Sequence, residues 1–392
     1  MADILHTLTS GQSLSIGGSG SPSLSTVSEE LNAYAIGSSG FPAALTNATN
    51  QFPHLSMGYT LARTRPLQKL GFSTHGQGSM SIAALSPGGS TGKFEEAIAR
   101  VQAGRDYAVA RSTSYALEPV IHWIQGEEDS KLNTPAATYL ASLTALRQAY
   151  IDQIHPITGQ DLSGLAWVMS QTASWAHPPN GAEPRIGLAQ LQAARTLPNF
   201  YVIGGQYQFP YADSQHMTNV GYYRMGELHA RAHQAVIDGL DWRPFAPREY
   251  VVTPAYVDVV YDVPSGALEF DTTTVPAQPA MGFSLPGSSA SITHVALVGE
   301  DTVRLLLSQP ITEPGTKVGY GVSSSIGGVG VGNLCDGEAA TSHYDGARIA
   351  NWALHSLDAL DIEGSNPVAF NVTAAYLTGA GGNLYPVGPV LS

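Results

Sequence analysis

The sequence predicts an α/β domain with a mainly parallel sheet over about residues 1–245, followed by a smaller all-β, sandwich-like domain over 246–392. Three observations lead to this prediction. A chain of 392 residues is too long for one ordinary core. Short apolar runs alternate with helical patterns in its first part. After about residue 250, β-rich runs separated by turns replace the helical patterns.

Five short apolar runs in the first part predict strands. They are Ile4–Thr9, Gln68–Ser73, Pro119–Ile124, Leu165–Ser170 and Phe200–Gly204. Strands that alternate with helices predict a parallel sheet covered on both faces. In such sheets the binding crevice lies at the loops that follow the carboxyl ends of the strands. The residues after each run are therefore the candidates for function.

Four stretches between these runs predict helices. In residues 134–155 the apolar side chains recur at three- and four-residue steps, with Thr134 as the expected N-cap and Pro135 at the first helical position. Residues 218–240 predict a second helix, with Thr218 as a cap and Gly239 as its end. The other two are Phe94–Ala110 and Pro184–Thr196.

The second part contains a turn signal at Gly299–Thr302, which predicts a hairpin, and a glycine-rich loop at 323–334 that could reach the first domain. The role of this domain stays open between carbohydrate binding, part of an active-site rim and oligomerisation. Tyr320, Tyr344 and Trp352 could stack on sugar rings, although aromatic residues of a sandwich more often belong to its core.

Composition argues against several kinds of partner. The formal net charge of −13 disfavours binding to nucleic acid or to an anionic membrane. We find no apolar run of 18 residues and no signal-peptide pattern at the start, so no membrane insertion is expected. Whether the protein works in the cytoplasm, outside the cell or on a virion stays open. The one cysteine, Cys335, allows no intrachain disulfide and is expected to be structural.

Polar residues with catalytic potential follow the predicted strands. Ser13 comes shortly after the first run, among glycines that allow tight turns. A serine nucleophile needs a general base, and an acid that orients this base. Asp213 and His216 lie three residues apart before the last helix, and can supply both. Gln125 follows the third run and could donate to an oxyanion.

Together these blocks resemble the SGNH (GDSL-like) hydrolase superfamily, in the carbohydrate esterase branch that includes sialate O-acetylesterases and acetylxylan esterases. The nucleophile block of that branch reads G-Q-S, as Gly11–Ser13 does. Its third block reads W-x-Q-G-E-x-D, which Trp123–Asp129 matches fully, and its last block reads D-x-x-H, as Asp213–His216 does. The resemblance covers about residues 3–240, and the third block is its specific part.

The resemblance implies a flavodoxin-like, three-layer α/β/α catalytic domain. It also implies roles for single residues: nucleophile Ser13, general base and acid His216, orienting carboxylate Asp213, oxyanion donors Ser13 N–H, Gly78 N–H (Gly76 being the alternative) and the Gln125 amide, and supporting residues Gln12 and Glu127. The second block, Gly76–Ser79, departs from the usual pair of adjacent glycines.

The expected function is a serine esterase that removes small acyl groups, above all acetyl, from carbohydrate without a metal or organic cofactor. The twelve histidines show no metal-ligand spacing. Two alternatives remain: a glycan-binding or phage-tail-like surface module with secondary or lost esterase activity, and a lipase-like enzyme for long acyl chains. The sugar, the acyl position and the oligomeric state are left open.

Overall fold

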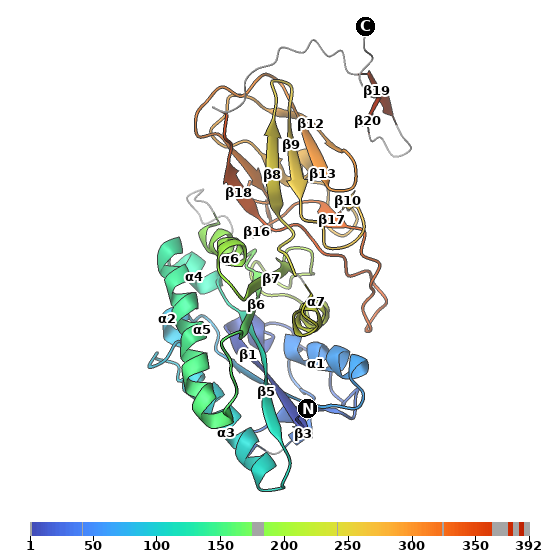
Figure 1. Cartoon of the computed structure of the whole chain (residues 1–392). Coiled ribbons are helices and arrows are strands. Elements are labelled where there is room, and N and C mark those ends of the chain that lie inside the picture. The colour runs from blue at the N-terminus through green and yellow to red at the C-terminus, as the bar shows by residue number, and fades with distance from the viewer. Residues whose placement is uncertain are drawn as a thin grey trace. The chain divides into compact units, whose positions relative to one another are not determined.

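The computed structural model describes residues 2–40, 42–174, 184–240, 242–323 and 325–362, and the backbone of 375–378 and 384–387. Most of 363–392, the end of the expected β domain, lies outside the described residues. The chain forms two compact units (Figure 1). The first contains residues 1–244 with 327–329 and 341–349, and the second contains 245–326, 330–340 and 350–392.

A seven-stranded sheet forms the centre of the first unit, in the order β3-β2-β4-β1-β5-β6-β7. Its strands are β1 (Ile4–Gly11), β2 (Ala33–Ile36), β3 (Pro42–Ala44), β4 (Lys69–Gly76), β5 (Tyr115–Ile124), β6 (Ala166–Gln171) and β7 (Phe200–Gly205). Neighbouring strands are parallel, except that β2 and β3 are antiparallel. The five predicted strands are confirmed. The short β2 and β3 are additions at one edge.

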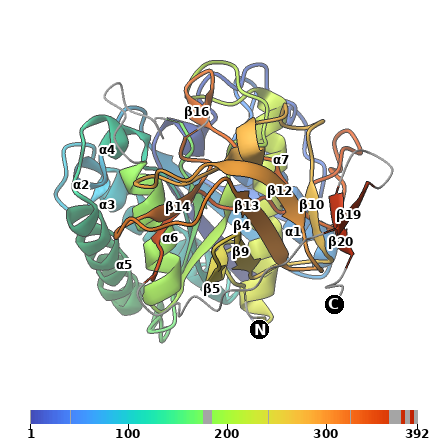
Figure 2. The ribbon, with the colours of Figure 1, turned by 90° about the horizontal axis from the view of Figure 1, so that it is seen from above.

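Helices cover both faces of this sheet, so the expected three-layer α/β/α architecture is confirmed (Figures 1 and 2). On one face, α1 packs against α7, and on the other face α5 packs against α3 and α6. The helices are α1 (Pro53–Thr64), α2 (Ile82–Leu85), α3 (Lys93–Val109), α4 (Glu127–Lys131), α5 (Ala136–Thr158), α6 (Arg185–Thr196), α7 (Asn219–Ile237) and the 3₁₀ turn η1 (Ser13–Ile16).

Adjacent residues of β5 show how the strand serves both layers, because side chains alternate between the two faces of a sheet. Ile124 belongs to a buried cluster with Met225 of α7. Trp123 points the other way, where its Nε1 lies 3.4 Å from the hydroxyl of Tyr139 on α5 and its ring lies 5.6 Å from that of Trp167. The end of β5 is therefore held firmly from both sides.

The two predicted helix caps have different outcomes. Thr218 caps α7 as predicted, since its hydroxyl accepts a hydrogen bond of 3.2 Å from the N–H of Gly221. The cap predicted at Thr134 is wrong. Pro135 occupies the cap position of α5, and the Thr134 hydroxyl instead donates to Asp129 Oδ1 at 2.8 Å. Thr134 therefore lies one residue before the cap position, and its hydroxyl serves the buried Asp129 carboxylate.

The second unit contains antiparallel sheets, as expected for the β-rich part. Four strands pair in the order β12-β13-β9-β8, and three pair in the order β11-β14-β18. Its strands are β8 (Pro247–Val252), β9 (Tyr256–Tyr261), β10 (Leu268–Phe270), β11 (Phe283–Ser284), β12 (Ile292–Leu297), β13 (Thr302–Leu307), β14 (Lys317–Tyr320), β15 (Ser325–Ile326), β17 (Leu334–Asp336), β18 (Ser356–Ala359), β19 (Ala375–Thr378) and β20 (Leu384–Val387), with the 3₁₀ turn η2 (Pro279–Gly282). In the two-residue strand β16 (Val329–Gly330), Val329 is assigned to the first unit and Gly330 to the second.

In this part the sequence predicted a hairpin and left the roles of three aromatic residues open. The turn at Gly299–Thr302 does join two antiparallel strands, β12 and β13. Tyr320 and Trp352 are buried core residues, and Cys335 is buried as well, whereas Tyr344, which belongs with the first unit, is half exposed.

Candidate active site

The ends of β4, β1 and β5 lie side by side and carry the first candidate residues. Gly11 closes β1 and pairs with Gly76 of β4 and with Ile124 of β5. Its φ is +149°, and a Cβ atom there would lie 2.0 Å from the carbonyl oxygen of Ile124. Only glycine lets β1 end this close to β5. Ser13 follows two residues later and starts η1.

Ser13, His216 and Asp213 form one hydrogen-bonded line. His216 Nε2 lies 3.0 Å from Ser13 Oγ, and His216 Nδ1 lies 3.0 Å from Asp213 Oδ2. The sequence separates Ser13 from His216 by 203 positions, so the fold brings them together. With Nδ1–H directed at the carboxylate, Nε2 is left to accept the proton of the serine hydroxyl.

The Asp213 carboxylate is held by the loop that carries it. Its Oδ1 accepts hydrogen bonds from the backbone N–H groups of Gln215 (2.7 Å) and His216 (2.6 Å). Partial burial acts to raise the pKa of Asp213, but these bonds and the His216 ring outweigh it, so the pKa lies below its usual value. Asp213 therefore stays ionised and fixed in orientation at neutral pH.

Gln12 links η1 to the third block, Trp123–Asp129. Its side-chain Oε1 accepts from the N–H groups of Gly126 (3.3 Å) and Glu128 (3.2 Å), at the start of α4. Its backbone N–H donates to the carbonyl of Ile124 at 3.0 Å. The glutamine of G-Q-S thus holds η1 against the end of β5, which is the supporting position expected for it.

The Gln125 amide points to a different place from the expected one. Its Nε2 donates to the carbonyl of Met80 at 3.2 Å and to Asp129 Oδ2 at 2.5 Å, and its Oε1 accepts from the Tyr139 hydroxyl at 3.0 Å. Both hydrogens of Nε2 are engaged, so the amide is not available to a developing oxyanion. Its contacts make Gln125 a brace between the second and third blocks, and the oxyanion role predicted for it needs this correction.

Asp129, the last residue of the W-x-Q-G-E-x-D block, connects three segments around the site. Its carboxylate accepts from the Ile82 N–H at 2.7 Å, from Gln125 and from Thr134. It joins the start of α2 to the end of β5 and to the turn before α5.

Glu127 is fully buried behind this edge of the sheet. Its Oε1 accepts a 2.6 Å hydrogen bond from the Thr172 hydroxyl, which comes directly after β6. Burial raises the pKa of Glu127 against the effect of that hydrogen bond. The bracing position expected for Glu127 agrees with this contact.

The geometry separates the two glycines of the second block. A Cβ atom at Gly76 would lie 2.2 Å from Ser15 Oγ and 3.1 Å from the carbonyl of Gly11, so Gly76 faces the packed interior. At Gly78 the nearest atom would be Ser13 Cβ, at 3.5 Å. Gly78 is thus the glycine that borders the serine side chain.

Gly18 also borders the site. A Cβ atom there would lie 3.0 Å from His216 Cδ2 and 3.1 Å from Ser13 Cβ. The hydroxyl of the neighbouring Ser19 lies 3.4 Å from Asp213 Oδ2. The sequence did not point to Ser19, because a serine in a glycine-rich turn carries no distinctive signal.

Two further findings concern the described residues. None of their helices is long and apolar enough to cross a membrane. Within the same part of the chain, no three histidine, cysteine, aspartate or glutamate side chains are placed to hold a metal ion.

The first unit has the fold of the SGNH (GDSL-like) hydrolases. Comparison of structures supports this through a carbohydrate acetylesterase from Xanthomonas citri, with a TM-score of 0.57 and 15% identity over 84% of this chain and 78% of the other. For a protein from Arabidopsis thaliana the TM-score is 0.47 and the identity 14%, over 60% of this chain and 99% of the other. For NanS the TM-score is 0.43 and the identity 12%, over 61% of this chain and 99% of the other. By sequence, the chain matches no protein-family model and no curated protein.

Proposed function

We propose that the chain is a serine esterase that hydrolyses small acyl esters, in particular O-acetyl groups of carbohydrates, through an acyl-enzyme. The observation that carries the proposal is the line from Ser13 Oγ through His216 to Asp213, with 3.0 Å at both steps. The likeness in fold to a carbohydrate acetylesterase supports the choice of substrate class.

The reaction follows from the positions of these atoms. His216 Nε2 takes the hydroxyl proton while Ser13 Oγ attacks the ester carbonyl, and Asp213 stabilises the imidazolium that forms. His216 then protonates the departing alcohol. A water molecule, deprotonated by His216, attacks the acyl-enzyme, and Ser13 regains its proton as the carboxylic acid leaves.

The oxyanion needs donors on the far side of the carbonyl from His216. We assign them to the backbone N–H groups of Ser13 and Gly78, because Gly78 borders the serine side chain and the Gln125 amide is engaged elsewhere. Each donor of this kind contributes about 3 kcal/mol to the transition state in serine hydrolases.

The first test is Ser13→Ala. We expect turnover of p-nitrophenyl acetate and release of acetate from acetylated oligosaccharides to fall about a thousandfold or more, while the circular dichroism spectrum is unchanged. Ser163→Ala, at an exposed loop before β6, is the matched control and should keep full activity. Undiminished turnover in Ser13→Ala would sink the proposal.

Two outcomes would favour the alternatives. Tight binding of an acetylated glycan by the wild type without any acetate release would indicate a glycan-binding module. A rate that rises from acetyl to octanoyl esters would indicate a lipase-like enzyme.

A further inference from the structure

We propose that Ser19 is a positioning residue of the candidate catalytic group, holding Asp213 through its hydroxyl. This inference rests on the esterase proposed above and goes beyond the Ser-His-Asp set. Ser19 Oγ lies 3.4 Å from Asp213 Oδ2, the same carboxylate oxygen that faces His216 Nδ1.

Ser19 belongs to a turn, Gly17–Gly20, that contacts the whole group. The Gly18 N–H donates to the carbonyl of Ser13 at 2.8 Å. The Cα of Gly18 faces both Ser13 and His216, since a Cβ atom there would lie about equally close to each. Ser19 then reaches Asp213. One turn therefore fixes the distance between nucleophile, base and carboxylate.

The turn is anchored on the helix that begins just after His216. The Tyr222 hydroxyl donates to the carbonyl of Gly18 at 2.7 Å, and the Asn219 amide donates to the carbonyl of Pro22 at 2.9 Å. Both side chains come from the first turn of α7, and Tyr222 is fully buried. These two bonds tie the turn that carries Ser19 to α7, while the Ser19 side chain itself is exposed.

The backbone conformation at Ser19 indicates that its side chain has a role. Its φ is +63°, in the left-handed region, where a side chain costs free energy and glycine does not. A turn that needed only its shape would be better served by glycine. The contact to Asp213 is what the serine side chain adds.

The hydrogen bond acts on the carboxylate. Oδ1 is fixed by the backbone N–H groups of Gln215 and His216, whereas Oδ2 has the His216 ring and Ser19. With the Ser19 donor in place, Oδ2 keeps its direction toward Nδ1 when His216 becomes charged. Without it, the carboxylate and the ring sample more orientations, and fewer encounters are productive.

Three variants separate this role from a structural one. Ser19→Gly fits the left-handed backbone and lacks the hydroxyl. Ser19→Asn tolerates the same backbone and brings an amide donor. Ser112→Gly is the matched control, because Ser112 has a φ of +54° in an exposed turn between α3 and β5, away from the site.

With p-nitrophenyl acetate, we expect Ser19→Gly to lower kcat about tenfold, with KM within about twofold of wild type and a thermal midpoint that is equal or higher. Ser19→Asn should recover most of kcat. Ser112→Gly should gain stability with kcat unchanged. The inference is overturned if Ser19→Gly keeps the wild-type kcat, or if Ser19→Gly and Ser19→Asn are equally slow.

A second readout needs no turnover and so separates the two proposals. The Nδ1–H proton of His216 can be followed by NMR in the wild type and in both variants. We expect faster exchange with solvent, and hence a broader signal, in Ser19→Gly only. A signal equally sharp in all three proteins contradicts the role of Ser19, even if the wild type proves inactive on every ester.

Discussion

A side chain at Gly18 would crowd Ser13 and His216. We predict that Gly18→Ala lowers kcat for p-nitrophenyl acetate about 10- to 100-fold, because the new methyl group must displace the imidazole at 3.0 Å or the serine at 3.1 Å. The measurement is kcat alongside the thermal midpoint.

Gly164→Ala is the control for this change. Gly164 is exposed before β6, and a Cβ atom there would meet nothing within 4 Å. It should leave kcat and the fold as they are. If Gly18→Ala were as active as this control, the imidazole would have more freedom than the contacts imply, and the positioning role of the turn would be weakened too.

At single residues, sequence reasoning located the candidate side chains where a block of letters fixes both the residue and its neighbours, and their catalytic roles stay predictions. Ser13, Asp213 and His216 were named from such blocks, and the structure brings them together. It failed for Gln125, because the direction of an amide depends on partners from other segments. The Met80 carbonyl and the Asp129 carboxylate decide that direction, and the sequence does not predict that either of them contacts Gln125.

Among the elements, α7 does two things at once. It begins just after His216, and it binds the segment 341–349 with polar side chains one turn apart. Arg224 pairs with Asp345 at 2.6 Å, Glu227 accepts from the His343 N–H at 2.7 Å, and Arg231 donates to the carbonyl of Ile349 at 2.8 Å.

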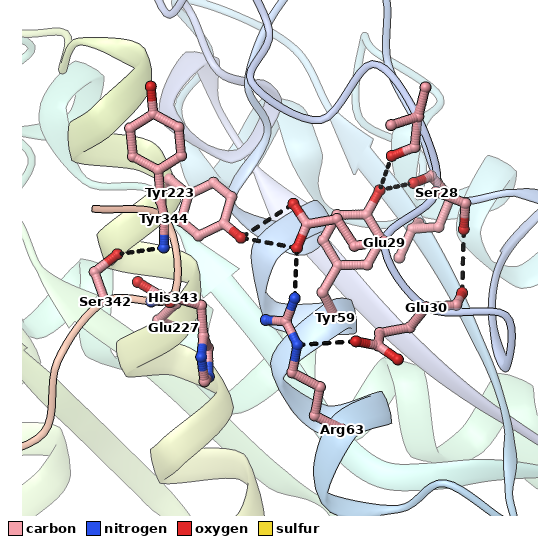
Figure 3. A network of polar contacts seen from close by, with 12 residues as sticks. Ser28, Glu29, Glu30, Tyr59, Arg63, Tyr223, Glu227, Ser342, His343 and Tyr344 are labelled. Carbon is pink, nitrogen blue, oxygen red and sulfur yellow. Dashed lines mark hydrogen bonds and ion pairs between the residues drawn. The ribbon is translucent and has the colours of Figure 1, made fainter. Parts of the chain in front are cut away.

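Figure 3 shows the network around this segment. Arg63 on α1 pairs with Glu29 at 2.8 Å and with Glu30 at 2.9 Å, and Glu29 also accepts from the hydroxyl of Tyr223 on α7. The ring of Tyr223 lies 5.4 Å from that of Tyr344. The network therefore ties the loop after η1, α1 and the segment 341–349 to α7.

Glu227 makes this region sensitive to pH. Burial raises its pKa to about 6, from an ordinary value of 4.5. A carboxyl with a raised pKa favours folding most below pH 4.5, and this contribution is lost as the pH rises through about 6. We predict that Glu227→Gln, which cannot ionise and still accepts from His343, is more stable than wild type at pH 8 by up to about 2 kcal/mol.

The measurement is urea unfolding at pH 5 and pH 8, followed by the fluorescence of the buried Trp123 and Trp167. The gap between Glu227→Gln and wild type should be wider at pH 8. Glu249→Gln, at an exposed site, serves as the control. A gap that is the same at both pH values would show that Glu227 ionises normally.

Helix α1 is the longest element that the sequence did not predict, and its burial explains why. Helix α1 is buried on most sides, from Pro53 through Tyr59 and again at Leu61 and Ala62. Its buried residues include His54, Ser56 and Gly58 as well as apolar side chains, so hydropathy alone does not mark the buried face. By contrast, α5 shows one buried stripe, and its pattern predicts it well.

For the whole molecule, the sequence indicates one change near residue 245, from alternating strands and helices to β-rich runs. The compact units, however, are not continuous in the chain. Residues 327–329 and 341–349 belong with the first unit. Val329 forms a β-bridge with Ser174, and Asp345 pairs with Arg224. Such contacts join positions more than a hundred residues apart, so no local pattern announces them.

The first unit also encloses many imidazoles, which predicts its response to acid. Burial lowers the pKa of His6, His54 and His229 to about 3, and that of His122 well below its ordinary value of 6.5. His122 Nδ1 lies 2.9 Å from Nδ1 of His229, so two of the four are in direct contact. These side chains stay neutral in the folded protein.

A base whose pKa is depressed by folding stabilises the fold above its unfolded pKa and loses this contribution as the pH falls. We therefore predict that the free energy of unfolding of the first unit declines from about pH 6.5 downward, by up to about 1.4 kcal/mol per pH unit for each histidine. Glu118, whose pKa is lowered by its basic neighbours against the effect of burial, adds to this loss only below about pH 4.5.

The slope of unfolding free energy against pH, taken between pH 6 and pH 5 from urea titrations, counts the protons bound on unfolding. Glu127 and Glu227 act in the opposite sense, because their pKa values are raised, and they reduce the net count. We expect a net uptake of two or more protons. His54→Asn should lower the count by one, since it removes one buried imidazole beside Thr74 and leaves a group that can still hydrogen-bond there. A flat profile from pH 7 to pH 5 would mean that the buried imidazoles gain protons without unfolding, against the burial described for them.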